Sequence, residues 1–371
     1  MERNRPGGGL YVLAFSVALA VYAGSAGGVV LHPNPTPGGP ELEVPAGQRP
    51  SDDVVGRWSS SASVVALSPR HIITTAHGGG GVGSSVTIGG QSYQVGWYYR
   101  HPTADLRVAV LTDLGEEPDL QDYVDIYRGS DEDTQTFVLG GYGVGRGDPL
   151  QTFYNDQWVT YGYEWGEGGN DTLRWGSNRI DPSPGFDLFA VWDGPGIAAA
   201  VPYEAIPADH DSGAGWFLDD GGEWKLAGLT QAVERTGESW YRNSGNPELP
   251  DPDEMYAVRV STNAYWVDMA LDGPLAGDFN TDGTVNITDL GALASNWQAS
   301  GPGVNWSDGD VNHDGKVNIT DLGAVASNWK HEYAPPAAAT MGGGQPVPEP
   351  GTLALLAVGA AALALRRRRK G

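Results

Sequence analysis

The stretch Ile72-Ile73-Thr74-Thr75-Ala76-His77 is an apolar, largely β-branched run that ends on a histidine just before the glycines at 78–81. Residues that branch at Cβ favour extended strands, whereas consecutive glycines favour a turn or loop. The stretch therefore predicts a buried strand that delivers His77 to a flexible loop.

Short apolar runs of the same kind surround this strand. Together with it they predict strands at 64–67, 72–75, 86–88, 108–111, 137–139 and 226–229. Turn residues separate the runs and no long helical pattern lies between them, which is typical of a β-barrel or a β-sandwich. The stretch 261–271 has apolar residues at helical spacing and predicts a closing helix. We place this domain at residues 51–271.

The composition excludes several classes of protein. The 371 residues include 22 Lys or Arg against 46 Asp or Glu, and the formal net charge of −24 argues against nucleic-acid binding, which needs a basic surface. The chain has no cysteine, so disulfides, thiol nucleophiles and thiolate zinc sites are excluded. Its 55 glycines and 26 prolines favour turn-rich β structure over helical bundles.

Two further motifs carry residues that could act together with His77. Asp105 opens the apolar strand that ends at Leu111, and Asp211-Ser212-Gly213 lies in a loop before the strand 226–229. A serine hydroxyl is a weak nucleophile until a base takes its proton, and an imidazole base needs a carboxylate to fix its tautomer and stabilise its cation. A His, an Asp and a Ser at the edges of strands are therefore the groups that acyl transfer requires.

The three motifs together resemble those of the chymotrypsin/trypsin-like serine peptidases, over most of residues 54–270. The resemblance implies a mainly β, double β-barrel fold and an endopeptidase that cleaves a polypeptide substrate. It implies that Ser212 is the nucleophile, His77 the general base and Asp105 its orienting partner. It also implies that the backbone amides of His210 and Ser212 form the oxyanion hole. Only 23 residues separate Val54 from His77 and no activation sequence of the family is evident, so we predict no conventional zymogen cleavage.

Several residues leave alternatives open. His210 stands where the family has a glycine, which could distort the oxyanion hole, and its ring is a competing candidate for the base. Asp187 is a second candidate for the acid of the triad. Ile206 aligns with the base of the family's specificity pocket and would disfavour Lys or Arg there. The domain could instead be a protease fold that has lost activity and binds a partner, or passive cargo of a scaffold protein.

A repeat with a spacing of 32 residues follows the β domain, over residues 277–330. Each copy places oxygen-bearing side chains at positions 1, 3, 5, 9 and 12 of a loop, has glycine at position 6 and adds the carbonyl of position 7, as in a loop of EF-hand type that binds Ca²⁺. The predicted ligands are Asp278, Asn280, Asp282, Thr284, Asn286 and Asp289 in the first copy, and Asp310, Asn312, Asp314, Lys316, Asn318 and Asp321 in the second. Apolar residues at helical spacing follow each loop, so the segment predicts two Ca²⁺ ions and two short helices that pack together.

The repeat resembles a type I dockerin, a small all-α module with the same duplicated loop-and-helix plan. The resemblance implies that Ca²⁺ folds the module and that it docks onto a cohesin domain. The recognition residues would be those at loop positions 10 and 11, which are Ile287, Thr288, Ile319 and Thr320. Because both copies carry the same pair, two equivalent docking orientations would be possible. A Ca²⁺-stabilised module with no partner is the alternative.

The two ends of the chain carry export signals. Residues 1–26 combine two arginines, an apolar run and small residues, which is the pattern of a secretory signal peptide, and 27–50 reads as a linker. After a second linker at 331–346, the segment 347–371 has a Pro-Glu-Pro, an apolar run and a basic cluster. These features resemble the PEP-CTERM sorting signal of Gram-negative envelope proteins, which implies a transient membrane anchor and processing by an exosortase-type enzyme. A plain C-terminal anchor is the alternative, and both readings place the body outside the cytoplasm.

Overall fold

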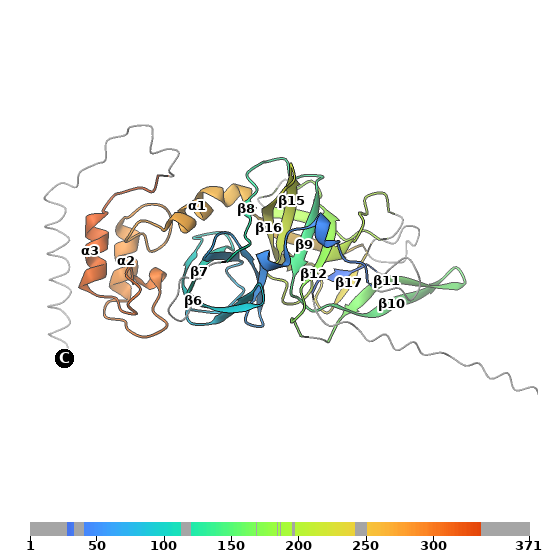
Figure 1. Ribbon diagram of the computed structural model, residues 1–371, viewed down its shortest axis with the longest axis horizontal. Helices are drawn as coiled ribbons and strands as arrows, with labels where there is room; N and C mark the ends of the chain where they lie inside the picture. The colour runs from blue at the N-terminus through green and yellow to red at the C-terminus, as the bar shows by residue number, and fades with distance from the viewer. Residues whose placement is uncertain are drawn as a thin grey trace, which may run out of the picture.

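The computed structural model of the chain describes residues 28–32, 41–112, 120–167, 169–183, 185, 187–194, 197–241 and 251–334. The predicted signal peptide at 1–26 and the sorting tail at 347–371 lie outside the described residues. Along the long axis of the molecule, Figure 1 shows the helices α2 and α3 at one end, then a closed barrel, then a second sheet with a projecting hairpin. The described part of the chain is mainly β, as predicted.

The first β assembly is a closed six-stranded barrel. Its strands are β2 (Val55–Trp58), β3 (Ala62–Ala66), β4 (His71–Thr74), β5 (Ser85–Ile88), β6 (Gln91–Arg100) and β7 (Arg107–Thr112). They pair in the order β2-β3-β4-β7-β6-β5, and β2 closes the ring on β5. Side chains such as Trp58, Ile72 and Leu111 form a separate buried cluster of this barrel. The closed ring fixes the ends of β4 and β7, from which His77 and Asp105 emerge.

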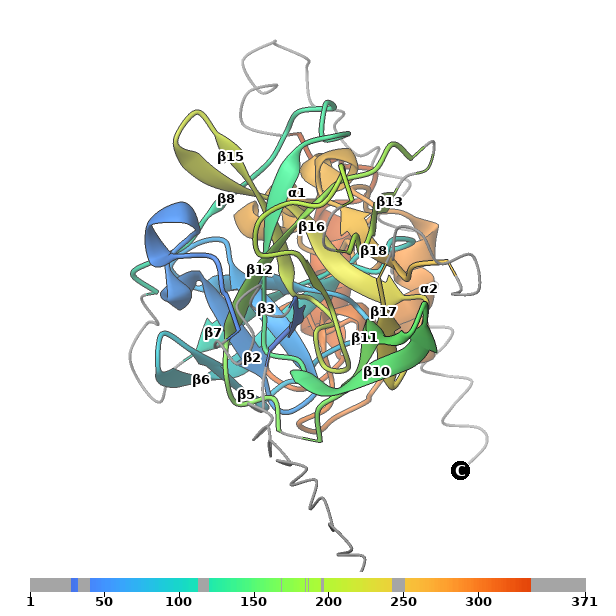
Figure 2. The ribbon, with the colours of Figure 1, turned by 90° about the vertical axis from the view of Figure 1, so that its right-hand side faces the viewer.

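The second assembly is a seven-stranded sheet, and together with the barrel it is consistent with a double β-barrel. Its strands are β8 (Asp125–Ile126), β9 (Thr136–Gly141), β12 (Arg174–Arg179), β13 (Asp187–Val191), β15 (Gly215–Asp220), β16 (Glu223–Val233) and β18 (Glu254–Arg259). Their order is β12-β9-β15-β16-β18-β13, with β8 added in parallel to β16. A three-stranded sheet adjoins it, made of β10 (Arg146–Tyr154), β11 (Gln157–Trp165) and β17 (Glu238–Trp240). Figure 2 shows the β10–β11 hairpin in front of the larger sheet.

Three α-helices follow in the described part of the chain: α1 (Ala264–Asp272), α2 (Ile287–Ser295) and α3 (Ile319–Ser327). The predicted closing helix and the two helices after the loops are therefore present. The side chains of Asn286 and Asn318 cap α2 and α3 by accepting hydrogen bonds from Thr288 N and Thr320 N. Such caps satisfy amides that a helix cannot bond internally, so the last loop residues also start the helices.

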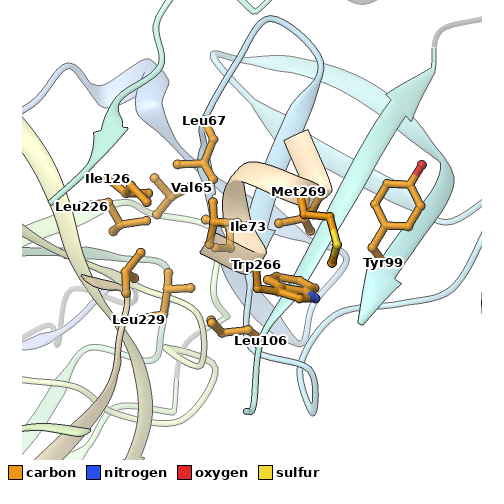
Figure 3. Close-up of a cluster of buried hydrophobic side chains, with 14 of the residues drawn as sticks. Val65, Leu67, Ile73, Tyr99, Leu106, Ile126, Leu226, Leu229, Trp266 and Met269 are labelled. Carbon is orange, nitrogen blue, oxygen red and sulfur yellow. The ribbon is translucent and has the colours of Figure 1, made fainter. Parts of the chain in front are cut away.

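One hydrophobic cluster runs through the barrel, the second sheet, α1 and the repeat module. Figure 3 shows its central part, where Ile73 and Leu106 of the barrel lie between Leu229 of the second sheet and Trp266 of α1. A second cluster fills the interior of the second sheet and includes Trp192 and Trp216. The shared cluster means that the parts of the molecule are packed on one another and not only tethered.

The structure differs from both predicted linkers. In the segment predicted as the linker 27–50, Val30 and Leu31 form a buried strand, β1 (Val30–Leu31), that pairs with β14 (Ala205–Ile206). In the segment predicted as the linker 331–346, Tyr333 N donates to the carbonyl of Gly283. The high Pro and Gly content of these segments hid short runs that pair with folded backbone.

Candidate functional site

Three side chains meet at the boundary between the barrel and the second sheet. The Nδ1 atom of His77 lies 2.5 Å from Asp105 Oδ2, and its Nε2 atom lies 2.8 Å from Ser212 Oγ. The imidazole therefore bridges a carboxylate and a hydroxyl, with one ring nitrogen for each. The His77 side chain is 46% exposed and that of Asp105 19%, so the imidazole is open to solvent while the carboxylate is partly shielded.

Asp105 holds both the ring and the backbone of His77. Its Oδ1 atom accepts a hydrogen bond of 2.9 Å from His77 N, and its carbonyl accepts one of 3.2 Å from Ala76 N. Burial alone would raise the pKa of Asp105. The hydrogen bonds and the charge of His77, together with the amide of Ala76, have a larger opposite effect, so the pKa of Asp105 lies below its ordinary value. The carboxylate is therefore ionised and fixed where it can orient the imidazole.

Ser212 is held in place from the barrel. The amide of Ser63 on β3 donates a hydrogen bond of 2.8 Å to the carbonyl of Ser212. Gly213 has a φ of +82°, and a Cβ there would lie 2.1 Å from Thr74 Oγ1 and 2.2 Å from Ser63 O. Only glycine fits this close approach, so the loop residue after Ser212 is determined by the packing of the second sheet onto the barrel.

Asp211 lies beneath the loop and is fully buried. Its carboxylate accepts hydrogen bonds of 2.7 Å from Gly143 N and 2.9 Å from Ala208 N. Burial raises the pKa of Asp211 to about 7, against the lowering effect of these two amides. The side chain therefore pairs internally with backbone amides and shapes the loop.

The predicted oxyanion hole has one open donor and one occupied donor. Among the described residues no hydrogen-bond acceptor contacts Ser212 N, whereas His210 N donates to the side chain of Asp209 at 3.2 Å. His210 has a φ of +71°, the left-handed conformation that favours glycine and that His adopts more readily than most other residues. The backbone thus takes the conformation expected of the family's glycine, but the side chain of Asp209 covers the amide. No sequence pattern predicts this contact.

Arg107 is a buried residue of the site that the sequence analysis missed. It is 5% exposed and donates from Nη1 to the carbonyl of Gly80 at 2.9 Å, and from Nη2 to that of Gly78. Its guanidinium carbon lies 4.1 Å from the ring centroid of Trp58. Arg107 thus fixes the glycine loop that follows His77, and its place two residues after Asp105 in an apolar strand was the available signal.

The alternatives to the three residues lie elsewhere. Asp105, and not Asp187, bonds to His77, and burial raises the pKa of Asp187. The ring of His210 lies 3.8 Å from Asp209 and, among the described residues, Ser212 Oγ is bonded to His77. The side chain of Ile206 is 1% exposed, inside the second cluster and beside β1.

The two repeat loops each fold back on their first aspartate. Gly283 N donates to Asp278 Oδ2 at 2.9 Å, and Gly315 N donates to Asp310 Oδ2 at 2.8 Å. The glycines at position 6 have positive φ angles of 89° and 74°. This is the sharp turn expected of a Ca²⁺-binding loop of this type.

The residues at the ligand positions fit a Ca²⁺ ion. In the first loop, Asn280 Nδ2 lies 2.9 Å from Asp282 Oδ2, and Asn286 Nδ2 lies 3.1 Å from the carbonyl of Thr284, so the predicted ligands contact each other in two pairs. Burial, followed by the negative charges of Asp289 and Asp282, raises the pKa of Asp278 to about 7. The hydrogen bond from the Gly283 amide lowers this pKa but does not cancel the rise. A divalent cation would relieve this repulsion.

The carboxylates of the two predicted Ca²⁺ loops are too few to hold an ion without other oxygen ligands. No group of three or more His, Cys, Asp or Glu in the described part of the chain is arranged to hold a metal ion. The oxygens of Asp289 accept amides of Phe279 at 2.8 Å and Asn286 at 2.8 Å. A Ca²⁺ ion would therefore depend on Asn side chains and carbonyls as well, which is the mixed oxygen set that Ca²⁺ accepts.

The predicted partner residues lie at the exposed starts of α2 and α3. The side chains of Ile287 and Ile319 are 69% and 68% exposed, and Thr288 and Thr320 are exposed beside them. Single exposed apolar residues are common on folded surfaces, so this exposure shows accessibility and not a partner. Both pairs are accessible, as two docking orientations would require.

Comparison with known protein families agrees with these C-terminal features. Residues 276–329 match the type I dockerin domain. Residues 346–369 match the PEP-CTERM protein-sorting motif. No curated protein matches the chain. The dockerin domain makes Ca²⁺ binding plausible and implies a cohesin partner, and the sorting motif points to export, exosortase processing and a membrane-anchored, surface-associated protein of Gram-negative bacteria.

The described helices include none that is both long and apolar enough to cross a membrane. The sorting tail, for which a transient anchor was predicted, lies outside the described residues.

Proposed function

We propose that residues 51–271 form a serine endopeptidase with a chymotrypsin-like double β-barrel. The observation that carries the proposal is the pair of contacts of His77, 2.5 Å to Asp105 and 2.8 Å to Ser212. These lie within the range in which a base takes a proton from a nucleophile and a carboxylate orients that base.

Each residue has a role in this proposal. His77 Nε2 takes the proton of Ser212 as Oγ attacks the carbonyl carbon of a peptide bond, and Asp105 stabilises the imidazolium that forms. The oxyanion of the tetrahedral intermediate accepts hydrogen bonds from Ser212 N and His210 N. His77 then donates its proton to the leaving amine, and water hydrolyses the acyl-enzyme with the same residue as base.

The contact between Asp209 and the amide of His210 favours a second candidate function. While the Asp209 carboxylate holds this amide, the oxyanion hole has only one free donor, and loss of one donor costs on the order of 10²–10³ in rate. A protease fold that binds a polypeptide without cleaving it is the alternative consistent with this contact. In the endopeptidase, the carboxylate turns away when substrate binds, which its 66% exposure permits.

Cleavage of an unfolded protein tests the endopeptidase. We expect the purified protein to cut casein into peptides, and Ser212→Ala to lose at least a thousandfold in rate. Asp209→Ala should keep or raise the rate, with Asp148→Ala on the exposed part of β10 as the matched control. Binding of casein with no cleavage by the parent or by Asp209→Ala would favour the binding domain.

We infer that the remaining segments place this activity at the cell envelope. The dockerin domain would bind two Ca²⁺ ions and attach the enzyme to a cohesin domain, and the tail would anchor the chain until an exosortase-type enzyme removes it. Residues 276–329 and 346–369 support these roles through their family matches.

A further inference from the structure

The repeat module is packed against the barrel that carries His77 and Asp105. Trp306, which follows α2 and is 4% exposed, lies edge-on to Tyr99 of β6 with ring centroids 5.4 Å apart. Its Nε1 atom donates a hydrogen bond of 2.6 Å to the carbonyl of Asp278, the first residue of the first loop. One buried tryptophan thus joins a predicted Ca²⁺ loop to a strand of the barrel.

Position 4 of each loop makes the other direct contacts with this strand. Thr281 Oγ1 of the first loop donates to the carbonyl of Arg100 at 2.7 Å. His313 of the second loop stacks on Trp97, with ring centroids 4.2 Å apart and planes 16° apart. Both residues have left-handed φ angles, 53° and 57°. The turn of each loop therefore directs the position-4 side chain to β6.

The differences between the two repeat copies agree with this contact. From position 1 to position 12 the loops differ only at positions 2, 4 and 7. Position 4 is Thr281 in one loop and His313 in the other, and each fits a different part of β6. Phe279 at position 2 of the first loop is 1% exposed and packs near Trp306, at 5.9 Å between ring centroids. The two copies are thus adapted to different places on one surface.

Arg100 connects this contact to the candidate active site. While its carbonyl accepts from Thr281, its Nη2 atom donates a hydrogen bond of 2.8 Å to the carbonyl of Ala76, the residue before His77. The amide of Ala76 in turn donates to the carbonyl of Asp105. A chain of hydrogen bonds therefore leads from position 4 of the first loop to the backbone of both His77 and Asp105.

We propose that the two loops, when they hold Ca²⁺, clamp strand β6 of the same chain through Thr281 and His313, and so stabilise the barrel segments that position His77 and Asp105. The carboxylates of each loop repel one another without a cation, so the loop opens and position 4 withdraws from β6. The partner residues Ile287 and Ile319 are exposed and take no part in this contact. The module can therefore stabilise the barrel while these residues stay accessible to a partner.

The stabilisation is independent of the chemistry of Ser212, and only its consequence for catalysis rests on the proposed function. Hydrogen exchange of the intact protein, measured by mass spectrometry with Ca²⁺ and after chelation, tests it directly. We expect Ca²⁺ to slow exchange at least tenfold in residues 277–330 and also in residues 72–77 and 97–111 of the barrel.

Thr281→Val tests the chain of hydrogen bonds from the first loop to the barrel. Valine has nearly the shape of threonine and the variant keeps all predicted ligands, so it should bind the same number of ions by titration calorimetry. It loses the hydrogen bond from Thr281 Oγ1 to the carbonyl of Arg100, and also those to the carbonyl of Asn280 and from Trp266 Nε1. We expect the Ca²⁺-dependent protection of the barrel to fall about fivefold, as the loss of about 1 kcal/mol implies. His313→Ala gives a second variant, and Thr136→Val at the exposed start of β9, away from the loops and the partner residues, is the matched control.

Protection confined to residues 277–330, or equal behaviour of Thr281→Val and Thr136→Val, would overturn the proposal. A protein that shows the expected exchange but has an unreactive Ser212 would refute the peptidase and leave the clamp standing.

Discussion

His77 is the residue at which the two β assemblies meet. Its own strand and that of Asp105 belong to the barrel, whereas Ser212 belongs to a loop of the second sheet. The motifs gave the three residues and their chain order, because each lies at the end of an apolar run. Their contact across 135 positions of sequence depends on how the assemblies pack, which no local pattern describes.

The acid of the triad can be tested against its rival. Asp105→Asn should lower the rate of casein cleavage on the order of 10⁴-fold, because an amide does not hold the imidazole in the required tautomer. Asp187→Asn is the matched control and should change the rate by no more than a few fold. Initial rates at saturating substrate measure both, and equal losses in the two variants would contradict the assignment of Asp105.

Asp211 predicts a pH dependence of stability. Its pKa is about 7 in the folded chain and about 4 in an unfolded one, so the folded chain retains the proton over this range. Ionisation then opposes folding, and stability falls as the pH rises from about 4 to about 7. Asp211→Asn should remove this contribution. The difference in unfolding free energy, variant minus parent, should therefore increase by about 1.4 kcal/mol for each pH unit between about 4 and about 7. Urea unfolding at several pH values measures it, and parallel curves would contradict it.

Among the elements, six buried apolar strands were predicted, whereas several others, apolar strands such as β15 among them, were not. The six predicted strands lie within or overlap β3, β4, β5, β7, β9 and β16, because their apolar side chains fill the interior. The ten-residue strand β6 was missed, since tyrosines, glutamines and a glycine hide its alternation. Strand β1 was missed because two residues are too few for a pattern.

The loop after β4 depends on Arg107. Arg107→Met keeps the aliphatic stem but leaves the carbonyls of Gly78 and Gly80 without their donors. We expect a loss of roughly 2 kcal/mol or more in unfolding free energy, because buried acceptors are left unpaired. Arg57→Met, which breaks an ion pair with the exposed Asp171, should cost no more than about 1 kcal/mol. Urea unfolding compares the two, and a smaller loss for Arg107→Met would contradict the role of this residue.

At the scale of the whole molecule, the predicted division into domains and linkers was only partly informative. The repeat, its two loops and its helices followed from residue spacing, and the dockerin match covers the same segment. Its packing against the barrel was not predicted, because Trp97, Tyr99 and Trp306 lie in segments without a motif. A shared core also implies that the module and the barrel unfold together.

The number of ions is a prediction for the intact protein. Titration of the chelator-treated protein with Ca²⁺ should give two bound ions, and Asp289→Asn or Asp321→Asn should each weaken one of them, because position 12 loses its charge. Asp148→Asn on β10 changes the net charge equally and should leave both sites unchanged. A stoichiometry other than two, or equal effects of the three variants, would contradict the assignment of the loops.

The central claim is that Ser212 is an activated nucleophile, and a serine-directed fluorophosphonate probe tests it without knowledge of the substrate. We predict that one probe molecule adds to the purified protein, that mass spectrometry places it on the peptide containing Ser212, and that Ser212→Ala and His77→Ala abolish the addition. Absence of labelling, or labelling that is unchanged in Ser212→Ala, would contradict the claim.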